Sequence, residues 1–182
     1  MPRFIAFLRA INVGGHIVKM DRLRELFESL GFSGVETFIA SGNVVFETRS
    51  NSAQTLERKI EQRLREALGY EVITFIRTDA ELAEIAHYQP FRQSDLDAAA
   101  ALNIAFLTDK LDDQSKQKLM ALRTEIDDFH VHEREIYWLC RKKQSESTFS
   151  NAVLEKTLRQ RATFRGTNTV KKMAAKYSSS KL

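Results

Sequence analysis

The sequence predicts an α+β protein made of two ferredoxin-like βαββαβ repeats followed by a C-terminal helix. In the first 77 residues, short apolar strands and helical spacing alternate in the order strand, helix, strand, strand, helix, strand. The same order starts again further on, where Ile104-Ala-Phe-Leu-Thr108 repeats Ile5-Ala-Phe-Leu-Arg9 at four of five positions. We therefore expect a first repeat (1–78), a short helix and linker (79–101), and a second repeat with a basic C-terminal helix (102–182).

The elements of the first repeat follow from hydrophobic spacing and from residues that begin or end helices. One helix starts near Met20 and ends at Gly31, and a second begins at a cap formed by Asn51-Ser52 and ends at Gly69. We interpret Ser41-Gly42-Asn43 as the turn of a hairpin. The expected strands are residues 4–9, 35–40, 44–47 and 72–76.

The second half of the chain carries similar signals. Thr78 to Glu81 has the pattern of a capping box, which begins a short helix that must stop before Pro90. Residues 91–101 are read as a linker. Further strands are expected at 104–108, 129–132, 136–140 and 162–164, and helices at 112–123, 150–158 and 170–177. Residues 178–182 are expected to form a frayed tail.

The composition is that of a globular protein. Of the 182 residues, 43% are hydrophobic and 29% charged, and no apolar run approaches the ~20 residues that a membrane span requires. Arg9 interrupts the apolar N-terminal run, which argues against a signal peptide. Since the single cysteine, Cys140, excludes an internal disulfide, we expect a cytosolic protein with a buried, structural thiol.

The charge is distributed unevenly. From Lys156 onward there are eight Lys or Arg and no acid, whereas the residues before it carry 20 basic and 24 acidic side chains. Such asymmetry indicates an anionic partner, nucleic acid included, or an acidic surface on the same molecule. The second alternative describes an interaction or scaffold protein without catalysis. The oligomeric state is left open.

A candidate site arises from the expected topology. The third strand of such a sheet lies antiparallel between the first and second, so the loop after the first strand and the hairpin turn emerge at one end. Glycines let backbone amides approach an anion, and nearby cations add charge-assisted bonds. We therefore expect a phosphate- or carboxylate-bearing ligand at Arg9, Asn12, Gly14, Gly15, Lys19, Ser41, Gly42 and Asn43. The alternative is that the glycines merely shape the connection.

The corresponding loops of the second repeat, around Asp109 and Glu133-Arg134, lack glycines, so the first repeat is the favoured location. The loop is neither a P-loop nor a dinucleotide fingerprint, and no cofactor is identified. No catalytic group is assigned either, since Ser41 lacks a nucleophile elbow and His16, which could act as an acid or base, has no evident partner.

Two further patterns, a pair of histidines and a set of three phenylalanines, each have a functional and a structural interpretation. His130 and His132 share a strand face and could begin a metal site, but zinc needs at least a third protein ligand, so a solvated hairpin edge is the favoured interpretation and no metal is expected. Phe4, Phe7 and Phe46 could stack nucleic-acid bases as in an RNA-recognition motif. Because the full motif of that module is missing, we expect these rings in the core.

Several of these segments resemble the domain-of-unknown-function 1697 family. The matching segments are Leu8-Arg9-Ala10-Ile11-Asn12-Val13-Gly14-Gly15, Leu30-Gly31-Phe32, Ser41-Gly42-Asn43-Val44-Val45-Phe46, and Thr163, Arg165 and Asn168-Thr169-Val170. The resemblance implies a soluble α+β protein with ferredoxin-like repeats and no assigned activity. It adds Arg165 and Asn168 as second contributors to the ligand site, although Gly166 replaces an asparagine of the family motif.

Overall fold

The structure is a computed structural model that describes residues 1–178, except for the side chains of Ala40 and Ser41. Its contacts divide the chain into two compact units. Unit 1 comprises Met1–Glu84 together with the chain from Lys172 onward, and unit 2 comprises Ile85–Lys171. The end of the C-terminal helix, which the sequence analysis assigned to the second repeat, thus groups with unit 1. Residues 179–182 of the expected tail lie outside the described part.

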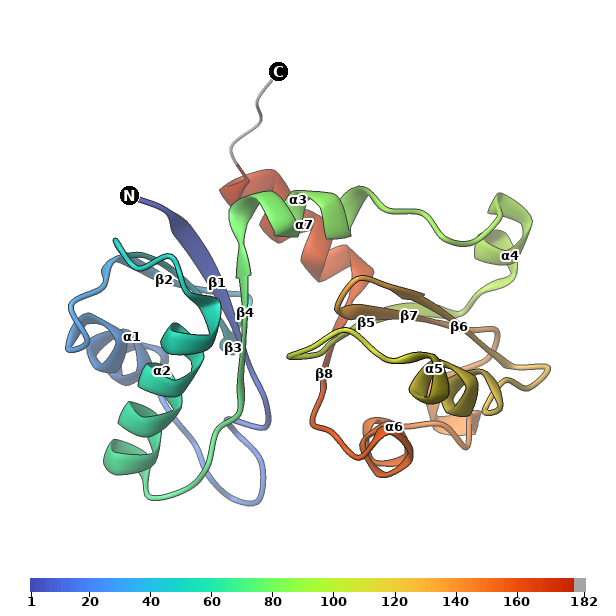
Figure 1. The fold of residues 1–182 in the computed structure, drawn as a ribbon, viewed down its shortest axis with the longest axis horizontal. Helices are drawn as coiled ribbons and strands as arrows, with labels where there is room; N and C mark the ends of the chain where they lie inside the picture. Colours follow the sequence, from blue (N-terminus) through green and yellow to red (C-terminus); the bar gives the residue numbers. More distant parts are fainter. Residues whose placement is uncertain (179–182) are drawn as a thin grey trace. The chain divides into compact units, whose positions relative to one another are not determined.

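Unit 1 contains a four-stranded antiparallel sheet in the order β2-β3-β1-β4. The third strand therefore lies between the first and second, as the βαββαβ pattern predicts. Helices α1 and α2 cover the same face of this sheet (Figure 1). The elements are β1 (Arg3–Leu8), α1 (Met20–Glu28), β2 (Ser33–Phe38), β3 (Ala40–Glu47), α2 (Ala53–Leu68) and β4 (Thr74–Thr78).

The core of unit 1 follows from the alternation of side chains along its strands. Phe4 and Phe46 join the cluster beneath the two helices, and the Phe32 and Phe46 rings stack with centroids 4.5 Å apart. Phe7 is also fully buried. The expectation that Phe4, Phe7 and Phe46 are core residues is confirmed.

The hairpin of unit 1 corrects one prediction. Ser41-Gly42-Asn43 is not the turn, because these residues lie inside β3, and the chain reverses at Ile39, which has a φ of 64°. The register slips between the pairs Thr37↔Val44 and Phe38↔Ala40, so the three residues form an irregularity opposite β2. Their polar and glycine composition is as typical of a bulge as of a turn, which explains the error.

Side chains of helix α2 accept hydrogen bonds from the backbone of edge strand β4. The backbone N–H of Ile76 donates to Glu57 (3.1 Å), and that of Thr74 donates to Glu61 (2.9 Å). Burial raises the pKa of Glu61. These carboxylates satisfy backbone donors that an exposed sheet edge would present to other chains.

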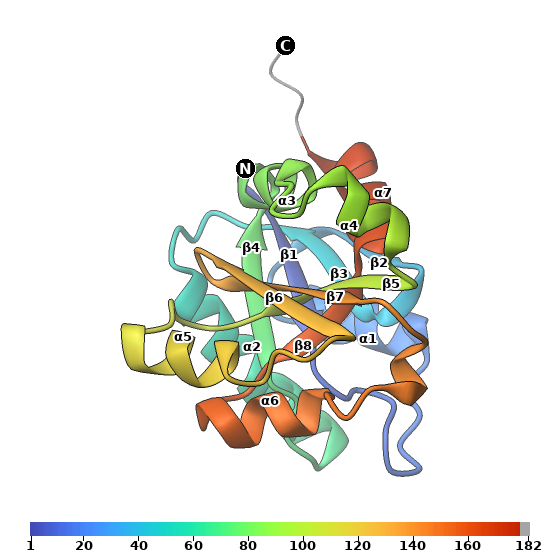
Figure 2. The ribbon, with the colours of Figure 1, turned by 90° about the vertical axis from the view of Figure 1, so that its right-hand side faces the viewer.

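Unit 2 repeats the topology with the strand order β6-β7-β5-β8, all neighbours being antiparallel. Its hairpin of β6 and β7 faces the viewer in Figure 2. The elements are β5 (Ala101–Phe106), α5 (Asp113–Met120), β6 (Asp127–His132), β7 (Glu135–Cys140), a 3₁₀ turn (Gln144–Glu146), α6 (Asn151–Leu158) and β8 (Thr163–Gly166).

A buried carboxylate organises the core of unit 2. Asp127 is 1% exposed and accepts hydrogen bonds from Trp138 Nε1 (2.9 Å), Ser147 Oγ (2.7 Å) and Thr124 Oγ1 (3.2 Å). Trp138 in turn packs edge-on against Phe149. Three donors compensate for the desolvation of the carboxylate, so Asp127 ties β6, β7 and the segment before α6 together.

Three helices connect or end the repeats: α3 (Asp79–His87), α4 (Gln93–Ala98) and α7 (Thr167–Tyr177). The predicted capping box is confirmed, since the N–H of Thr78 donates to Glu81 and the N–H of Glu81 donates to the Thr78 hydroxyl. The predicted linker at 91–101 is partly wrong because it contains α4 and the start of β5.

The C-terminal end of α7 contacts β2 within unit 1, where the hydroxyl of Tyr177 donates to Glu36 at 2.8 Å.

Candidate functional site

The loop after β1 is braced by its own residues. Asn12 Oδ1 accepts a hydrogen bond from the N–H of Val18 at 2.8 Å, and the Tyr70 hydroxyl donates to the carbonyl of Ile11 at 2.8 Å. Gly14 and Gly15 have φ values of 70° and 82°, and a Cβ at either would meet nothing within 4 Å. Their positive φ values therefore favour glycine. Lack of space does not, because no other group comes close enough to exclude a side chain.

The other predicted residues of unit 1 lie at the same end of the sheet, since Asn43 pairs with Phe7 near the end of β1. Arg9 is half-buried and Lys19 is exposed at the N-cap of α1. Asn43 is 3% exposed and donates from Nδ2 to the carbonyl of Phe38. Gly42 is half-buried beside it, and the Ser41 side chain lies outside the described part.

Asn12 and Asn43 thus each make a hydrogen bond to the backbone of unit 1. These bonds stabilise the loop and the irregular strand. A ligand site at this end of unit 1 stays a prediction.

Arg165 and Asn168 occupy different environments in unit 2. The guanidinium of Arg165 donates to the Thr163 hydroxyl and to the carbonyl of Phe164, both at 2.8 Å, and burial lowers the pKa of Arg165 to about 10. Asn168 is exposed in the first turn of α7. Among the described residues, no hydrogen-bond partner of the Asn168 side chain is found, and this residue lines a cavity.

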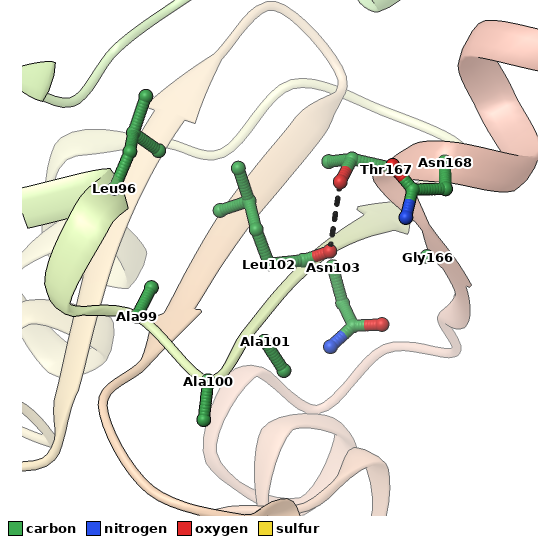
Figure 3. Close-up of a pocket in the computed structure, with 9 residues that line it drawn as sticks. All are labelled: Leu96, Ala99, Ala100, Ala101, Leu102, Asn103, Gly166, Thr167 and Asn168. Atoms are coloured by element: carbon green, nitrogen blue, oxygen red, sulfur yellow. Dashed lines mark hydrogen bonds between the residues drawn. The ribbon is translucent and has the colours of Figure 1, made fainter.

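The cavity has a volume of about 350 Å³ and lies where the fourth strand of unit 2 stops. Strand β8 pairs with β5 from Asn103 to Phe106, so the first two residues of β5 have no partner strand on that side. Helix α7 begins there, and the Thr167 hydroxyl donates to the carbonyl of Leu102 at 3.2 Å (Figure 3). The lining residues are Leu96, Ala99, Ala100, Ala101, Leu102, Asn103, Gly166, Thr167 and Asn168.

Asn103 is the unusual residue of this cavity. Its Nδ2 is buried and has no hydrogen-bond partner within residues 1–178. A buried donor without a partner costs roughly 1–3 kcal/mol, and such groups are rare in folded proteins. Asn103 is therefore a group that a ligand could satisfy.

The N-terminus of α7 adds a positive electrostatic field. Its first turn contains no acidic residue, whereas the first turn of α3, the helix that follows β4 in unit 1, contains Asp79 and Glu81. The unsatisfied N–H groups at a helix N-terminus attract anions. A cavity that combines this terminus with amide side chains is suited to hydrogen-bonding an anion.

A family model described as "Protein of unknown function (DUF1697)" matches residues 1–137. The chain belongs to the DUF1697 family. A structure described as the conserved bacterial protein SP0830 from Streptococcus pneumoniae is similar, with a TM-score of 0.77 and 23% identity over 96% of this chain and 97% of that chain. This likeness supports the fold alone. No curated protein matches the sequence significantly.

The remaining candidate residues of this DUF1697 chain, His130, His132 and Cys140, lie among other side chains of the fold. His130 and His132 do not form a solvated edge, because the Tyr88 hydroxyl lies 2.8 Å from His130 Nε2 and the Tyr88 ring stacks on His132 at 3.8 Å. Cys140 is buried, as expected. Residues 1–178 contain no group of three His, Cys, Asp or Glu placed to hold a metal, and no helix in this range is long and apolar enough to cross a membrane.

Of the polar residues that line this cavity, Asn168 was predicted as a ligand contact, which stays a prediction, and Asn103 and Thr167 were not. An asparagine inside the apolar run Leu102 to Phe106 was the available signal, because strands of a buried sheet rarely place an amide between apolar residues. The sequence does not show whether that amide has a partner, because its surroundings depend on which distant segments pack around it.

Proposed function

We propose that this protein binds a small phosphate- or carboxylate-bearing ligand in the cavity at the N-terminus of α7. The observation that carries the proposal is that Asn103 lines that cavity and that its buried Nδ2 has no hydrogen-bond partner among the described residues. An anionic oxygen beside it would accept the missing hydrogen bond and remove the penalty of the buried donor.

The surrounding groups support an anion over a cation. Within residues 1–178, no carboxylate lines the cavity, and the first turn of α7 has no acidic residue. Asn168 contributes an amide whose N–H groups can donate to an anion, whereas the Thr167 hydroxyl already donates its proton to the carbonyl of Leu102. This location replaces the loop of unit 1 as the favoured place for the anionic ligand predicted from the sequence.

The experiment is isothermal titration of the full chain with inorganic phosphate, in parallel with two variants. Asn103→Leu removes the amide while keeping a side chain of similar size. The double substitution Arg9→Gln and Lys19→Gln removes two cations from the loop of unit 1. We expect Asn103→Leu to weaken phosphate binding by about tenfold, equivalent to one lost hydrogen bond to an anion.

We expect the double variant to bind phosphate as the natural sequence does. If Asn103→Leu binds normally and the double variant does not, the ligand site is the loop of unit 1. If none of the three proteins binds phosphate or acetate, the proposal is wrong.

Nucleic acid is the second candidate, and exposed cations near the C-terminus favour it. Lys156, Arg159, Lys171 and Lys172 are exposed, and among the described residues they form no ion pair. Three other basic residues are otherwise engaged: Lys176 pairs with Glu36, Arg161 with Glu155, and Arg165 is held by Thr163 and Phe164.

Fluorescence anisotropy of labelled RNA and DNA across a salt series tests this candidate. Binding that weakens steeply with salt would support contacts with the phosphate backbone, and its absence at low salt would remove the candidate.

A further inference from the structure

Unit 2 contains a second cavity, of about 190 Å³, whose wall is mainly apolar. It lies between the end of α3, the segment that follows it, strands β5 and β7, and the start of α7. Successive side chains of a strand point to opposite faces, so Ile104 in this cavity and Asn103 in the first lie on opposite faces of β5. The lining residues are Ile85, Ala86, Tyr88, Gln89, Pro90, Phe91, Leu96, Leu102, Ile104, Tyr137, Thr167 and Lys171.

Among the described residues, Lys171 is the single charged residue in this wall. The hydroxyls of the wall have partners, since Tyr137 donates to the carbonyl of Ile85 at 3.0 Å, Tyr88 contacts His130 and Thr167 donates to the carbonyl of Leu102. A ligand in this cavity would therefore meet one cation, an amide from Gln89, hydroxyls that already have partners and otherwise apolar side chains. This pattern, apolar walls with few polar anchors, is typical of small-molecule sites.

We propose that this second cavity binds a small apolar acid, with a single ring or a short branched chain among the apolar side chains and a carboxylate paired with Lys171. The volume supports this class, because it lies below the roughly 300 Å³ of the smallest drug-sized pockets. A nucleotide is too large for it. The two cavities share Leu96, Leu102 and Thr167, but Lys171, on which this inference rests, lines only the second.

The wall is held in place before any ligand arrives. The Tyr88 ring stacks on His132, its hydroxyl bonds to His130, and the Tyr137 hydroxyl anchors the end of α3. Side chains that are already fixed lose little freedom when a ligand binds. Two strands of the hairpin thus support one side of the cavity.

The test is an NMR titration of the ¹⁵N-labelled full chain with benzoate and, separately, with neutral benzyl alcohol. The variants are Lys171→Gln, which removes the charge in the wall, and Lys172→Gln, which removes the neighbouring exposed lysine outside it. A third variant, Ala86→Leu, fills the cavity with a larger apolar side chain.

We expect saturable shifts at Ala86, Phe91, Leu102 and Ile104 with benzoate. Lys171→Gln should weaken benzoate binding by about tenfold and leave benzyl alcohol binding unchanged, because only the acid uses the charge. Lys172→Gln should change neither, and Ala86→Leu should abolish both.

The proposal is overturned if millimolar benzoate shifts none of these amides, or if Lys171→Gln and Lys172→Gln bind benzoate equally well. Inorganic phosphate, titrated into the same proteins, reports on the first cavity. Because Lys171 does not line that cavity, loss of benzoate binding with retained phosphate binding separates failure here from failure of the proposed function.

Discussion

The two sheets share one topology but differ in how far the fourth strand extends. In unit 1, β4 pairs with β1 from Phe4 to Leu8, which leaves only Arg3 of that strand uncovered. In unit 2, β8 pairs with β5 from Asn103 to Phe106 and leaves Ala101 and Leu102 uncovered. The cavity lined by Asn103, whose Nδ2 has no partner among the described residues, lies at this uncovered end. We propose the ligand site here, and a site at the glycine-bearing loop of unit 1 stays a prediction.

The helices that follow β4 and β8 differ in the charge of their first turns. Helix α3 carries its own acid at the N-terminus, where Glu81 bonds to the N–H of Thr78. Helix α7 has no acid in its first turn, and the Thr167 hydroxyl is directed to the carbonyl of Leu102. One helix N-terminus carries its own acid, and the other is the one at which we propose that an external anion binds.

The largest expected effect concerns the hairpins, which the two units stabilise by different means. Unit 1 uses an aromatic cluster around Phe46, whereas unit 2 uses the buried carboxylate of Asp127. Replacing Asp127 with alanine leaves the indole N–H of Trp138 buried without this acceptor, and we expect the free energy of unfolding to fall by about 3 kcal/mol.

Urea denaturation followed by fluorescence of Trp138, the single tryptophan, measures this loss. Ser147→Ala, which removes one donor and keeps the carboxylate, is the matched control, with an expected loss of about 1 kcal/mol. Equal losses for the two variants would mean that Asp127 is not the centre of the network.

The second prediction concerns a variant in which the first turn of α7 carries an acid, as the first turn of α3 does. Thr169→Glu places an acid in the first turn of α7, where its charge competes with an external anion. We expect phosphate affinity to fall by about tenfold or more while the helix is slightly stabilised. Thr169→Gln, of equal size and without charge, should bind phosphate normally. Unchanged affinity in the glutamate variant would show that the α7 N-terminus does not contact the anion.

The third prediction concerns the glycine-bearing loop. Gly15→Ala forces a residue with a Cβ into a φ of 82°, and we expect it to lower the free energy of unfolding by about 1 kcal/mol without altering phosphate affinity. Thermal unfolding and titration of the same sample measure both. Loss of phosphate binding with unchanged stability would instead favour the loop as the ligand site.

The smallest effect is a pH dependence in unit 2. Burial lowers the pKa of His130, the neighbouring His132 lowers it further, and Asp128 opposes them. Between this lowered pKa and the ordinary value of about 6.5, the unfolded chain binds more protons than the folded one. The contribution of His130 to the free energy of unfolding is complete above its ordinary pKa. It is lost as the pH falls from that value to the lowered pKa of the folded state.

Unfolding measured between about pH 7.5 and about pH 5.5 should therefore show a steeper loss for the natural sequence than for His130→Gln, by less than about 1.4 kcal/mol per pH unit. The glutamine keeps a polar group near Tyr88 but does not titrate in this range. Parallel pH profiles for the two proteins would contradict the assignment to His130.

Much of the fold could be predicted because it is encoded locally. Hydrophobic spacing, the caps at Ser52 and Gly69 and the capping box at Thr78 each specify an element from a few adjacent residues. The turn at Ile39 could not be found in this way, since an apolar residue at positive φ is an exception to turn preferences.

The candidate site was harder to predict because it depends on register. The cavity lies where β8 stops pairing with β5 at Gly166, and no short segment of sequence specifies where two distant strands stop pairing. Conversely, Asn12 looked like a ligand contact but accepts a bond from Val18 six residues later. Local composition suggested anion binding, which remains a proposal, and it could not choose between the units.

The most direct test of the central claim is to map where phosphate binds, by recording ¹H–¹⁵N spectra of the full chain during a titration with inorganic phosphate. The account predicts saturable shifts of the Asn103 side-chain amide and of the backbone amides of Thr167 and Asn168, with the loop from Arg9 to Lys19 unchanged. Shifts confined to that loop, or no saturable shifts in either unit, would contradict it.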